Sequence, residues 1–380
     1  MAARLARLRK EGNEIIVVVS AMGDTTDDLL ALASEITDNP HRRELDMLLT
    51  AGERISMALL SMALNALDCP AISFTGSQSG IITDSGHGHA KIKDVRPVRI
   101  REELNGGRVV IVAGFQGVSP EKEVTTLGRG GSDTSAVALA VAFKAAECAI
   151  YTDVDGVMTA DPRIVPGARR LDRLDFDTML EFSSRGAGVI NFRAVELARA
   201  YRMPLAILNS LRSAPGTRID GEIGMEKKGI AGVTANDRVV GIQIEGLKIE
   251  TGGMSPFVGW LSGLGLDISG LHQYTDSSGQ AGFSFTVNER PGHPAGLSKL
   301  EEEVKTRGGR LARDESLGAV SVVGYGVIDP LAVAARCLEV LAGVGIAPRS
   351  FLSGTLSMTF VVPRAEVARA VKTLHDTLVA

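Results

Sequence analysis

Aromatic residues and cysteines are scarce in this sequence. Phe, Trp and Tyr make up 4% of its 380 residues, with a single Trp, so the core has to be built from aliphatic side chains. Cys69, Cys148 and Cys337 lie far apart, which argues against a disulfide framework and favours a reducing, cytoplasmic location. The six histidines show no spacing typical of metal ligands, so we expect no metal site built by the protein alone.

Strong charge and long apolar runs are also missing. The formal net charge of −4 gives no basic signature for binding nucleic acid or anionic lipid. No segment has the pattern of a signal peptide or the length of a membrane-spanning run. We therefore expect no nucleic-acid partner and no membrane association. The 44% hydrophobic and 23% charged residues are typical of a globular protein, and 380 residues suffice for two or three domains.

Short apolar runs alternate with helical patterns through the first half of the chain. Runs at residues 15–19, 71–74, 109–113, 148–151 and 205–208 predict buried strands. The helical patterns between them predict an α/β fold with a mostly parallel, doubly wound sheet. In such folds, ligands bind at the carboxyl ends of the strands.

A glycine-rich stretch, Thr126-Leu-Gly-Arg-Gly-Gly-Ser-Asp-Thr-Ser135, leads into an apolar helical segment at residues 136–143. Its three glycines allow a tight turn and the close approach of a ligand. Ser132, Asp133 and Thr134 are candidates to cap the helix, whose N-terminus would attract an anion. Arg129 adds a fork of donors suited to a carboxylate or phosphate. The alternative interpretation is an ordinary capped helix after a flexible loop.

Polar residues also follow the first strand. Ser20, Asp24, Thr25 and Thr26 offer side-chain oxygens that could hold a small polar substrate at a strand end. The alternative is that Thr26 or Asp27 simply caps the next helix.

A long helical pattern at residues 44–67 carries Glu53 and Arg54 next to Gly52. A glycine among buried positions permits the close approach of another group. The alternative is that Glu53 and Arg54 belong to a solvated helix face.

Three aspartates, Asp153, Asp155 and Asp161, cluster beyond the strand at residues 148–151. A carboxylate there could align a metal–phosphate complex or a substrate. The stretch lacks the other ligands and the closing Glu of an EF-hand. The alternative is a set of turn-forming residues.

The character of the sequence changes beyond residue 222. Two segments resemble each other at an offset of about 80 residues, most clearly at residues 261–266 and 341–346. Each has a predicted βαββ order, which indicates a small α+β, ferredoxin-like module. We therefore predict three parts, at residues 1–222, 230–305 and 310–380.

The motifs, in this order, resemble those of aspartate kinases (aspartokinases), a family with the amino-acid kinase fold. The resemblance covers essentially the whole chain. The matching stretches are Val19-Ser-Ala-Met-Gly-Asp-Thr-Thr-Asp27, Thr50-Ala-Gly-Glu-Arg-Ile-Ser56, Phe74-Thr-Gly-Ser-Gln78, Thr126-Leu-Gly-Arg-Gly-Gly-Ser-Asp-Thr134, Tyr151-Thr-Asp-Val-Asp-Gly156 and Thr159-Ala-Asp-Pro-Arg163. The C-terminal repeat is similar to the paired ACT modules that regulate this family.

The resemblance implies a reaction. The γ-phosphoryl group of ATP would be transferred to the side-chain carboxylate of L-aspartate with the assistance of Mg²⁺. This reaction is the first step in the biosynthesis of lysine, threonine and methionine. The resemblance also implies an amino-acid effector at the ACT modules and a homo-oligomer.

The resemblance also implies site residues. Arg129 would pair with the α-carboxylate of aspartate and Glu53 with its α-ammonium group. The full set expected to hold aspartate is Ser20, Asp24, Thr25, Thr26, Asp27, Glu53, Arg129, Gly130, Gly131 and Ser132. The set expected to line the nucleotide pocket is Thr152, Asp153, Met158, Thr159, Ala160, Asp161, Pro162 and Arg163. The residues expected to act in catalysis are Arg129, Asp133 and Asp153.

The sequence departs from the family pattern in three places. The family's first strand carries Lys-Phe/Tyr-Gly-Gly, whose lysine neutralises the transferring group, and this sequence begins beyond it, which predicts weak turnover. Gly188 stands where many relatives have a lysine. The modules carry Glu250-Thr-Gly-Gly-Met-Ser-Pro256 and Tyr325-Gly-Val-Ile-Asp-Pro330 in place of Asp-x-Pro-Gly. The alternative function is therefore an impaired paralogue that binds aspartate or nucleotide as a regulatory subunit.

Overall fold

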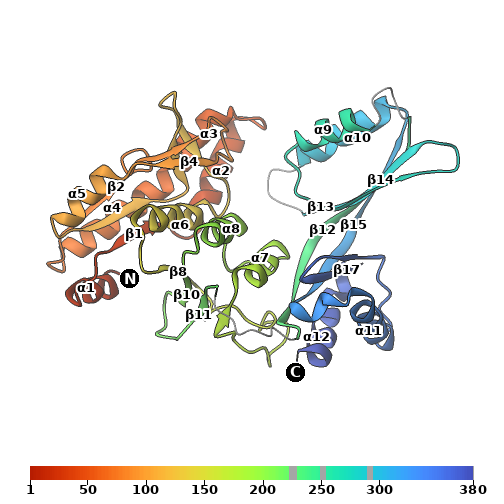
Figure 1. Cartoon of the computed structure of the whole chain (residues 1–380). Coiled ribbons are helices and arrows are strands. Elements are labelled where there is room, and N and C mark those ends of the chain that lie inside the picture. Colours follow the sequence, from red (N-terminus) through yellow and green to blue (C-terminus); the bar gives the residue numbers. More distant parts are fainter. Residues whose placement is uncertain (222–228, 249–253, 289–293, 380) are drawn as a thin grey trace. The chain divides into compact units, whose positions relative to one another are not determined.

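The structure is a computed structural model that describes residues 1–221, 229–248, 254–288 and 294–379 (Figure 1). It divides into two compact units. The first unit comprises Met1–Val157, Arg170–Ser183 and Gly188–Ile223, and the second comprises Met158–Arg169, Ser184–Ala187 and Gly224–Ala380. The domain boundary predicted at residue 222 lies outside the described residues. So do residues 250–253, which belong to the motif quoted for the first module.

A parallel three-stranded sheet is the centre of the first unit. Its order is β1 (Ile16–Val19), β5 (Val109–Ala113) and β2 (Ala71–Phe74). Both neighbours pair with β5 in parallel, so the carboxyl ends of all three strands lie at one edge. All residues of β5 are buried, as expected for a continuous apolar run in a central strand.

Helices cover both faces of this sheet. They are α1 (Ala2–Lys10), α4 (Ala51–Asn65), α5 (Val98–Asn105) and α6 (Gly131–Phe143). Val110 and Val112 share a core with α5 and α6, whereas Val109 and Ile111 share a core with α1 and α4. Successive side chains of a strand point to opposite faces, so one apolar strand supplies both cores. The predicted doubly wound fold is confirmed.

Two further sheets and four helices complete the first unit. One sheet has the order β4 (Ile92–Val95), β3 (Ile81–Thr83), β6 (Gln116–Val118), β7 (Val124–Thr126). The other has the order β8 (Cys148–Thr152), β10 (Leu205–Asn209), β11 (Thr217–Ile219), β9 (Arg173–Leu174). The helices are α2 (Thr25–Ile36), α3 (Arg42–Leu49), α7 (Phe176–Ser184) and α8 (Phe192–Tyr201).

Some predicted boundaries were wrong. The helix expected at residues 44–67 is two helices, α3 and α4, which meet at Thr50. The Thr50 hydroxyl donates to the Met47 carbonyl at 2.9 Å, which satisfies a backbone acceptor at the end of α3. The helix expected at Ala136 begins earlier, at Gly131.

One helical stretch, residues 42–65, is long and apolar enough to cross a membrane by length and composition, although no such run was expected from the sequence. Core helices of globular proteins meet the same criterion. The stretch comprises α3 and α4 and contains the buried carboxylates Asp46 and Glu53. Helix α4 also packs on the central sheet, so part of its apolar surface has a partner within the first unit, whereas Ile55, Leu59 and Met62 are exposed.

The second unit contains one antiparallel six-stranded sheet. Its order is β13 (Ile268–Thr275), β14 (Ala281–Asn288), β12 (Gly232–Leu247), β15 (Arg310–Val323), β17 (Ser357–Pro363), β16 (Ser350–Ser353). Its α-helices are α9 (Ser255–Ser262), α10 (Pro294–Thr306), α11 (Pro330–Gly343) and α12 (Val367–Leu378). The order βαββα therefore occurs twice, with a helix after each predicted βαββ segment.

Each repeat has its own core, and the two longest strands serve both. The first core joins β12 and β14 to α9 and α10, and the second joins β15 and β17 to α11 and α12. Val233, near the start of β12, belongs to the second core, whereas Val240 belongs to the first. In β15, Leu311 packs on the first core and Val320 on the second. The start of β12 thus completes the core of the second module, and the start of β15 completes the core of the first.

A segment from the predicted kinase part is built into the second unit. Ala160 and Val165 are buried in the second core. The carbonyl of Thr159 accepts from the amide of Val233 at 2.7 Å, and its hydroxyl contacts His375 Nε2 of α12 at 2.9 Å. The chain passes from the first unit to the second between Val157 and Met158.

Candidate active site

The loop after β1 lies at the carboxyl edge of the central sheet. Ser20 is exposed, and the next turn leads into α2. The Thr25 hydroxyl donates to the Met22 carbonyl at 2.6 Å, so Thr25 folds the loop. Thr26 is half-buried, and Asp24 and Asp27 are exposed. Asp24 precedes α2, but its side chain makes no capping hydrogen bond, which leaves its carboxylate available.

Glu53, in the first turn of α4, contacts this loop. One carboxylate oxygen, Oε1, accepts from the Ala21 amide at 3.1 Å. The contact depends on Gly52, where an added Cβ would lie 2.8 Å from the Cβ of Ala21. Gly52 therefore permits the close approach that the sequence predicted, and the approaching group is the loop after β1.

The Glu53 carboxylate is buried and only partly satisfied. The residue is 3% exposed, and its second oxygen, Oε2, has no hydrogen-bond partner among the residues that the structure describes. Burial raises the pKa of Glu53, and hydrogen bonds from the backbone amides of Glu53 and Ala21 lower it only in part. A buried anionic oxygen without a donor is costly, so a cation placed beside it would be stabilising. The alternative that Glu53 lies on a solvated helix face was wrong.

The glycine-rich loop runs from β7 into α6. Gly128 and Gly130 have positive φ values of +81° and +71°, which residues with a side chain rarely adopt. Gly131 begins α6, and a Cβ there would lie 2.8 Å from the Cβ of Leu127. Arg129 projects from this loop with an exposed side chain, and its Nη2 lies 3.6 Å from Asp27 Oδ1. This ion pair places the first turn of α2, which follows the loop after β1, next to the glycine-rich loop.

Ser132 and Asp133, in the first turn of α6, have different surroundings. Ser132 lies against the end of β5, since a Cβ on Gly114 would lie 2.8 Å from both its Cβ and its Oγ. Asp133 Oδ2 accepts from the Asn191 amide at 2.9 Å, and burial raises the pKa of Asp133.

Burial also raises the pKa of the Cys148 thiol to about 12, with a smaller effect from Asp133, so this cysteine is unreactive.

Two residues that hold the loop were not singled out as site residues from the sequence. The Asn191 side chain donates to the Arg129 carbonyl at 3.0 Å. Arg193 donates to the Leu127 carbonyl at 2.6 Å and to the Ala90 carbonyl at 2.9 Å. Both lie at the start of α8, where Asn191 is the N-cap residue, and only Gly188 of the stretch just before was compared with the family pattern. Their proximity to the loop arises only from the tertiary fold.

The residues expected around the nucleotide fall in both units. Thr152 and Asp153 belong to the first, where the Thr152 hydroxyl donates to Asp153 Oδ1 at 3.0 Å and the Asp153 carboxylate is exposed. The others, Met158, Thr159, Ala160, Asp161, Pro162 and Arg163, belong to the second unit. Thr159 and Ala160 are buried there, whereas Pro162 and Arg163 are exposed. Arg163 holds the carboxylate of Asp161 at 2.7 Å and keeps its pKa low.

Among the residues that the structure describes, no three His, Cys, Asp or Glu side chains converge as a metal site. The exposed Asp153 carboxylate suits a Mg²⁺ ion that arrives with the phosphates of a nucleotide, since such ions take only one or two ligands from the protein.

Comparison with known families matches both parts of the chain. Residues 1–209 match the amino acid kinase family, and residues 320–378 match the ACT domain. An aspartokinase from Mycolicibacterium smegmatis is 43% identical over 384 aligned residues, which cover 99% of this chain and 91% of that protein. An aspartokinase from Geobacillus stearothermophilus is 41% identical over 99% of this chain and 92% of that protein.

Solved structures agree with this match. Aspartate kinase from Synechocystis is 35% identical with a TM-score of 0.54, over 99% of this chain and 65% of that chain. E. coli aspartokinase III, solved with aspartate and ADP, has the same fold, with a TM-score of 0.85 at 21% identity over 100% of this chain and 96% of that chain. The identities of more than 40% over nearly the full length show that the chain belongs to the aspartokinase family.

Proposed function

We propose that this chain transfers the γ-phosphoryl group of ATP to the side-chain carboxylate of L-aspartate, giving 4-phospho-L-aspartate. The observation that carries the proposal is the convergence of Glu53 and Arg129 on one loop after β1. Glu53 contacts Ala21 of that loop, and Arg129 contacts Asp27 in the first turn of α2, the helix that follows the loop. An amino acid substrate presents an ammonium group and a carboxylate, which require an acidic and a basic partner held at a fixed separation.

Glu53 is the proposed partner of the substrate ammonium group. Its Oε2 atom lacks a donor and is covered by protein, so the loop after β1 has to shift when aspartate binds. The ammonium group would then supply the missing donor. Arg129 would exchange its exposed pair with Asp27 for a bidentate pair with the α-carboxylate. The remaining contacts are assigned to Ser20, Asp24, Thr25, Thr26, Gly130, Gly131 and Ser132.

The ATP contacts are assigned to the chain that follows β8, at residues 152–163. Asp153 has the exposed carboxylate that a phosphate-bound Mg²⁺ ion needs, and such an ion would neutralise charge on the transferring group. Arg163 is the exposed cation of this stretch. Phosphoryl transfer depends mainly on positioning and charge neutralisation, so these residues would act by orientation and electrostatics. Asp133 would act indirectly, because it holds Asn191, which in turn holds the glycine-rich loop.

The C-terminal unit suits regulation. We assign it to the binding of an amino-acid effector and to self-association, since residues 320–378 match the ACT domain. The product would enter the pathway to lysine, threonine and methionine in the cytoplasm.

The binding step can be tested with Arg129→Ala. The change removes a charge-assisted bidentate contact and should weaken aspartate binding by about 2–4 kcal/mol in calorimetric titration. Arg108→Ala is the matched control, because Arg108 precedes β5 at the opposite end of the strand and pairs with Glu103. Equal aspartate affinities of the Arg129→Ala chain and the unmodified chain would remove Arg129 from the site.

A further inference from the structure

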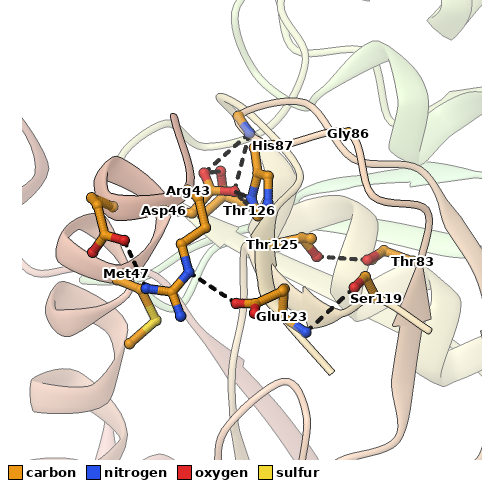
Figure 2. A network of polar contacts seen from close by, with 12 residues as sticks. Arg43, Asp46, Met47, Thr83, Gly86, His87, Ser119, Glu123, Thr125 and Thr126 are labelled. Atoms are coloured by element: carbon orange, nitrogen blue, oxygen red, sulfur yellow. Dashed lines mark hydrogen bonds and ion pairs between the residues drawn. The ribbon is translucent and has the colours of Figure 1, made fainter. Parts of the chain in front are cut away.

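A fully buried carboxylate, Asp46 of α3, lies outside every motif that marks the aspartate site. It is 0% exposed. It accepts hydrogen bonds from His87 Nδ1 at 2.7 Å, from the Gly88 amide at 3.1 Å, and from the Thr126 amide at 3.2 Å and hydroxyl at 2.5 Å. Figure 2 shows the Asp46 carboxylate, the His87 ring and Thr126 directed toward one another. Burial of a carboxylate is costly unless such donors are fixed around it.

The donors belong to two segments that Asp46 holds together. His87 and Gly88 lie in the loop between β3 and β4, and Thr126 is the last residue of β7. The same two segments are joined a second time, because the Ala90 amide donates to the Thr126 carbonyl at 2.8 Å. Thr126 is thus fixed through its amide, its hydroxyl and its carbonyl.

The chain between Thr126 and Arg129 is also tightly held. Leu127 is 1% exposed, its amide donates to the Phe115 carbonyl at 2.8 Å, and its carbonyl accepts from Arg193. Gly128 has φ +81°, and a Cβ there would lie 3.1 Å from the Gly88 carbonyl oxygen. Thr126 and Arg129 are therefore joined by only two residues: Leu127, held by hydrogen bonds, and Gly128, which has no room for a side chain beside Gly88.

We infer that Asp46 is a positioning residue for aspartate binding, which fixes Arg129 through Thr126. This inference rests on the proposed function, since it requires Arg129 to bind the α-carboxylate of aspartate. Asp46 itself touches no substrate. In Asp46→Asn the amide would turn a donor toward the donors of His87, Gly88 or Thr126, so the segment would move while the shape of the side chain is kept.

The test is calorimetry of the full chain with L-aspartate and, separately, with ATP. Asp46→Asn and Thr126→Val should each raise the dissociation constant for aspartate about tenfold or more and change that for ATP less than about twofold. Thr126→Ser retains the hydroxyl and should restore aspartate binding. The control is Thr83→Val, which breaks a buried hydrogen bond of 2.6 Å to Thr125 in the same sheet (Figure 2). It should lower the melting temperature and leave both dissociation constants unchanged.

The outcomes separate a positioning role from a structural one. Unchanged aspartate binding in Asp46→Asn and Thr126→Val would overturn the inference, as would an equal loss for aspartate and ATP or the same loss in Thr83→Val. If Asp46→Asn fails to fold, the pair Thr126→Val and Thr126→Ser decides the question. If the wild-type chain binds no aspartate, the proposed function and this inference both fail. If the wild-type chain binds aspartate and the variants bind it equally well, only the inference fails.

Discussion

At the scale of single residues, Glu53 is distinguished by its surroundings. It is buried, its Oε2 has no donor within the described part of the chain, and burial raises its pKa. A group with these properties reduces the stability of the ligand-free fold, which is typical of a site that a ligand completes. The same features that make Glu53 costly in the free chain would make it a strong partner for an ammonium group.

Glu53 gives a pH prediction. Its folded pKa lies above the reference value of 4.5, so the folded state resists deprotonation more than the unfolded state does. The stability contribution of Glu53 is therefore greatest below pH 4.5 and is lost as the pH rises through the raised folded pKa. Glu53→Gln removes this dependence, and the variant should be more stable than the wild-type chain at neutral pH. Urea unfolding of both chains between pH 4 and pH 8 is the measurement, and parallel stability curves would contradict the expectation.

The sequence predicted some site residues and not others, for a physical reason. Glu53, Arg129 and the glycines lie in short motifs whose residues act together locally. Asp46 bonds His87 and Thr126, which lie 41 and 80 residues away, so no local spacing marks it. Asn191 meets Arg129 across 62 residues for the same reason. Residues that position a site through the tertiary fold leave no pattern in a single sequence.

At the scale of elements, buried apolar segments were the most predictable. The strands β1, β5, β8 and β10 and the second half of helix α6 overlap apolar runs of the sequence. Strand β5, which is buried at every residue, needs no polar face. The polar strand β4, Ile-Lys-Asp-Val, was not predicted, since its structure depends on pairing with β3. Helix α12 was also missed, although its buried positions Val367, Ala370, Val371 and Leu374 have the spacing of one helix face.

The turn at residues 158–169 belongs to the second unit, although it was predicted to lie in the kinase part. Its sequence lies next to Asp153, so it was assigned to the kinase part. In the structure, the Thr159 hydroxyl accepts from the Arg169 amide at 2.9 Å and contacts His375 of α12. Ala160 and Val165 are buried in the second core. Helix α12 therefore supports the turn that carries Asp161 and Arg163.

Thr159→Val tests this support. It leaves the Arg169 amide and the His375 ring without their partner, which should cost about 1–3 kcal/mol of local stability. Amide hydrogen exchange at residues 158–169 should become faster, with residues of the first unit unchanged. Thr286→Val is the control, because it removes a hydroxyl that donates to the Ser269 carbonyl in the other module of the same unit. Exchange at residues 158–169 that is as slow as in the wild-type chain would show that the contact does not hold the turn.

At the scale of the whole molecule, the two C-terminal modules cannot be separated without damage. Strands β12 and β15 run through both modules and contribute to both cores. The six-stranded sheet ends at β13 and β16, whose edges lack a neighbour within the described residues. Leu271 on β13 and Phe351 on β16 are each 44% exposed. Open edges with exposed apolar residues are usually covered in native proteins.

These edges predict self-association of the chain. Light scattering at micromolar concentration should give a mass of at least two chains. Leu271→Lys and Phe351→Lys place charges on the edge strands and should shift the mass toward one chain, whereas Leu211→Lys, at an exposed position of the first unit, should not. A wild-type chain with the mass of a monomer would refute this prediction.

The most direct test of the assigned reaction is an assay of phosphoryl transfer with purified chain, ATP and Mg²⁺. Acyl phosphate is trapped as its hydroxamate while ADP release is followed in parallel. We predict hydroxamate and ADP in equal amounts with L-aspartate, and loss of both with Arg129→Ala. ADP release without hydroxamate, or at a rate that does not depend on aspartate, would contradict the assignment.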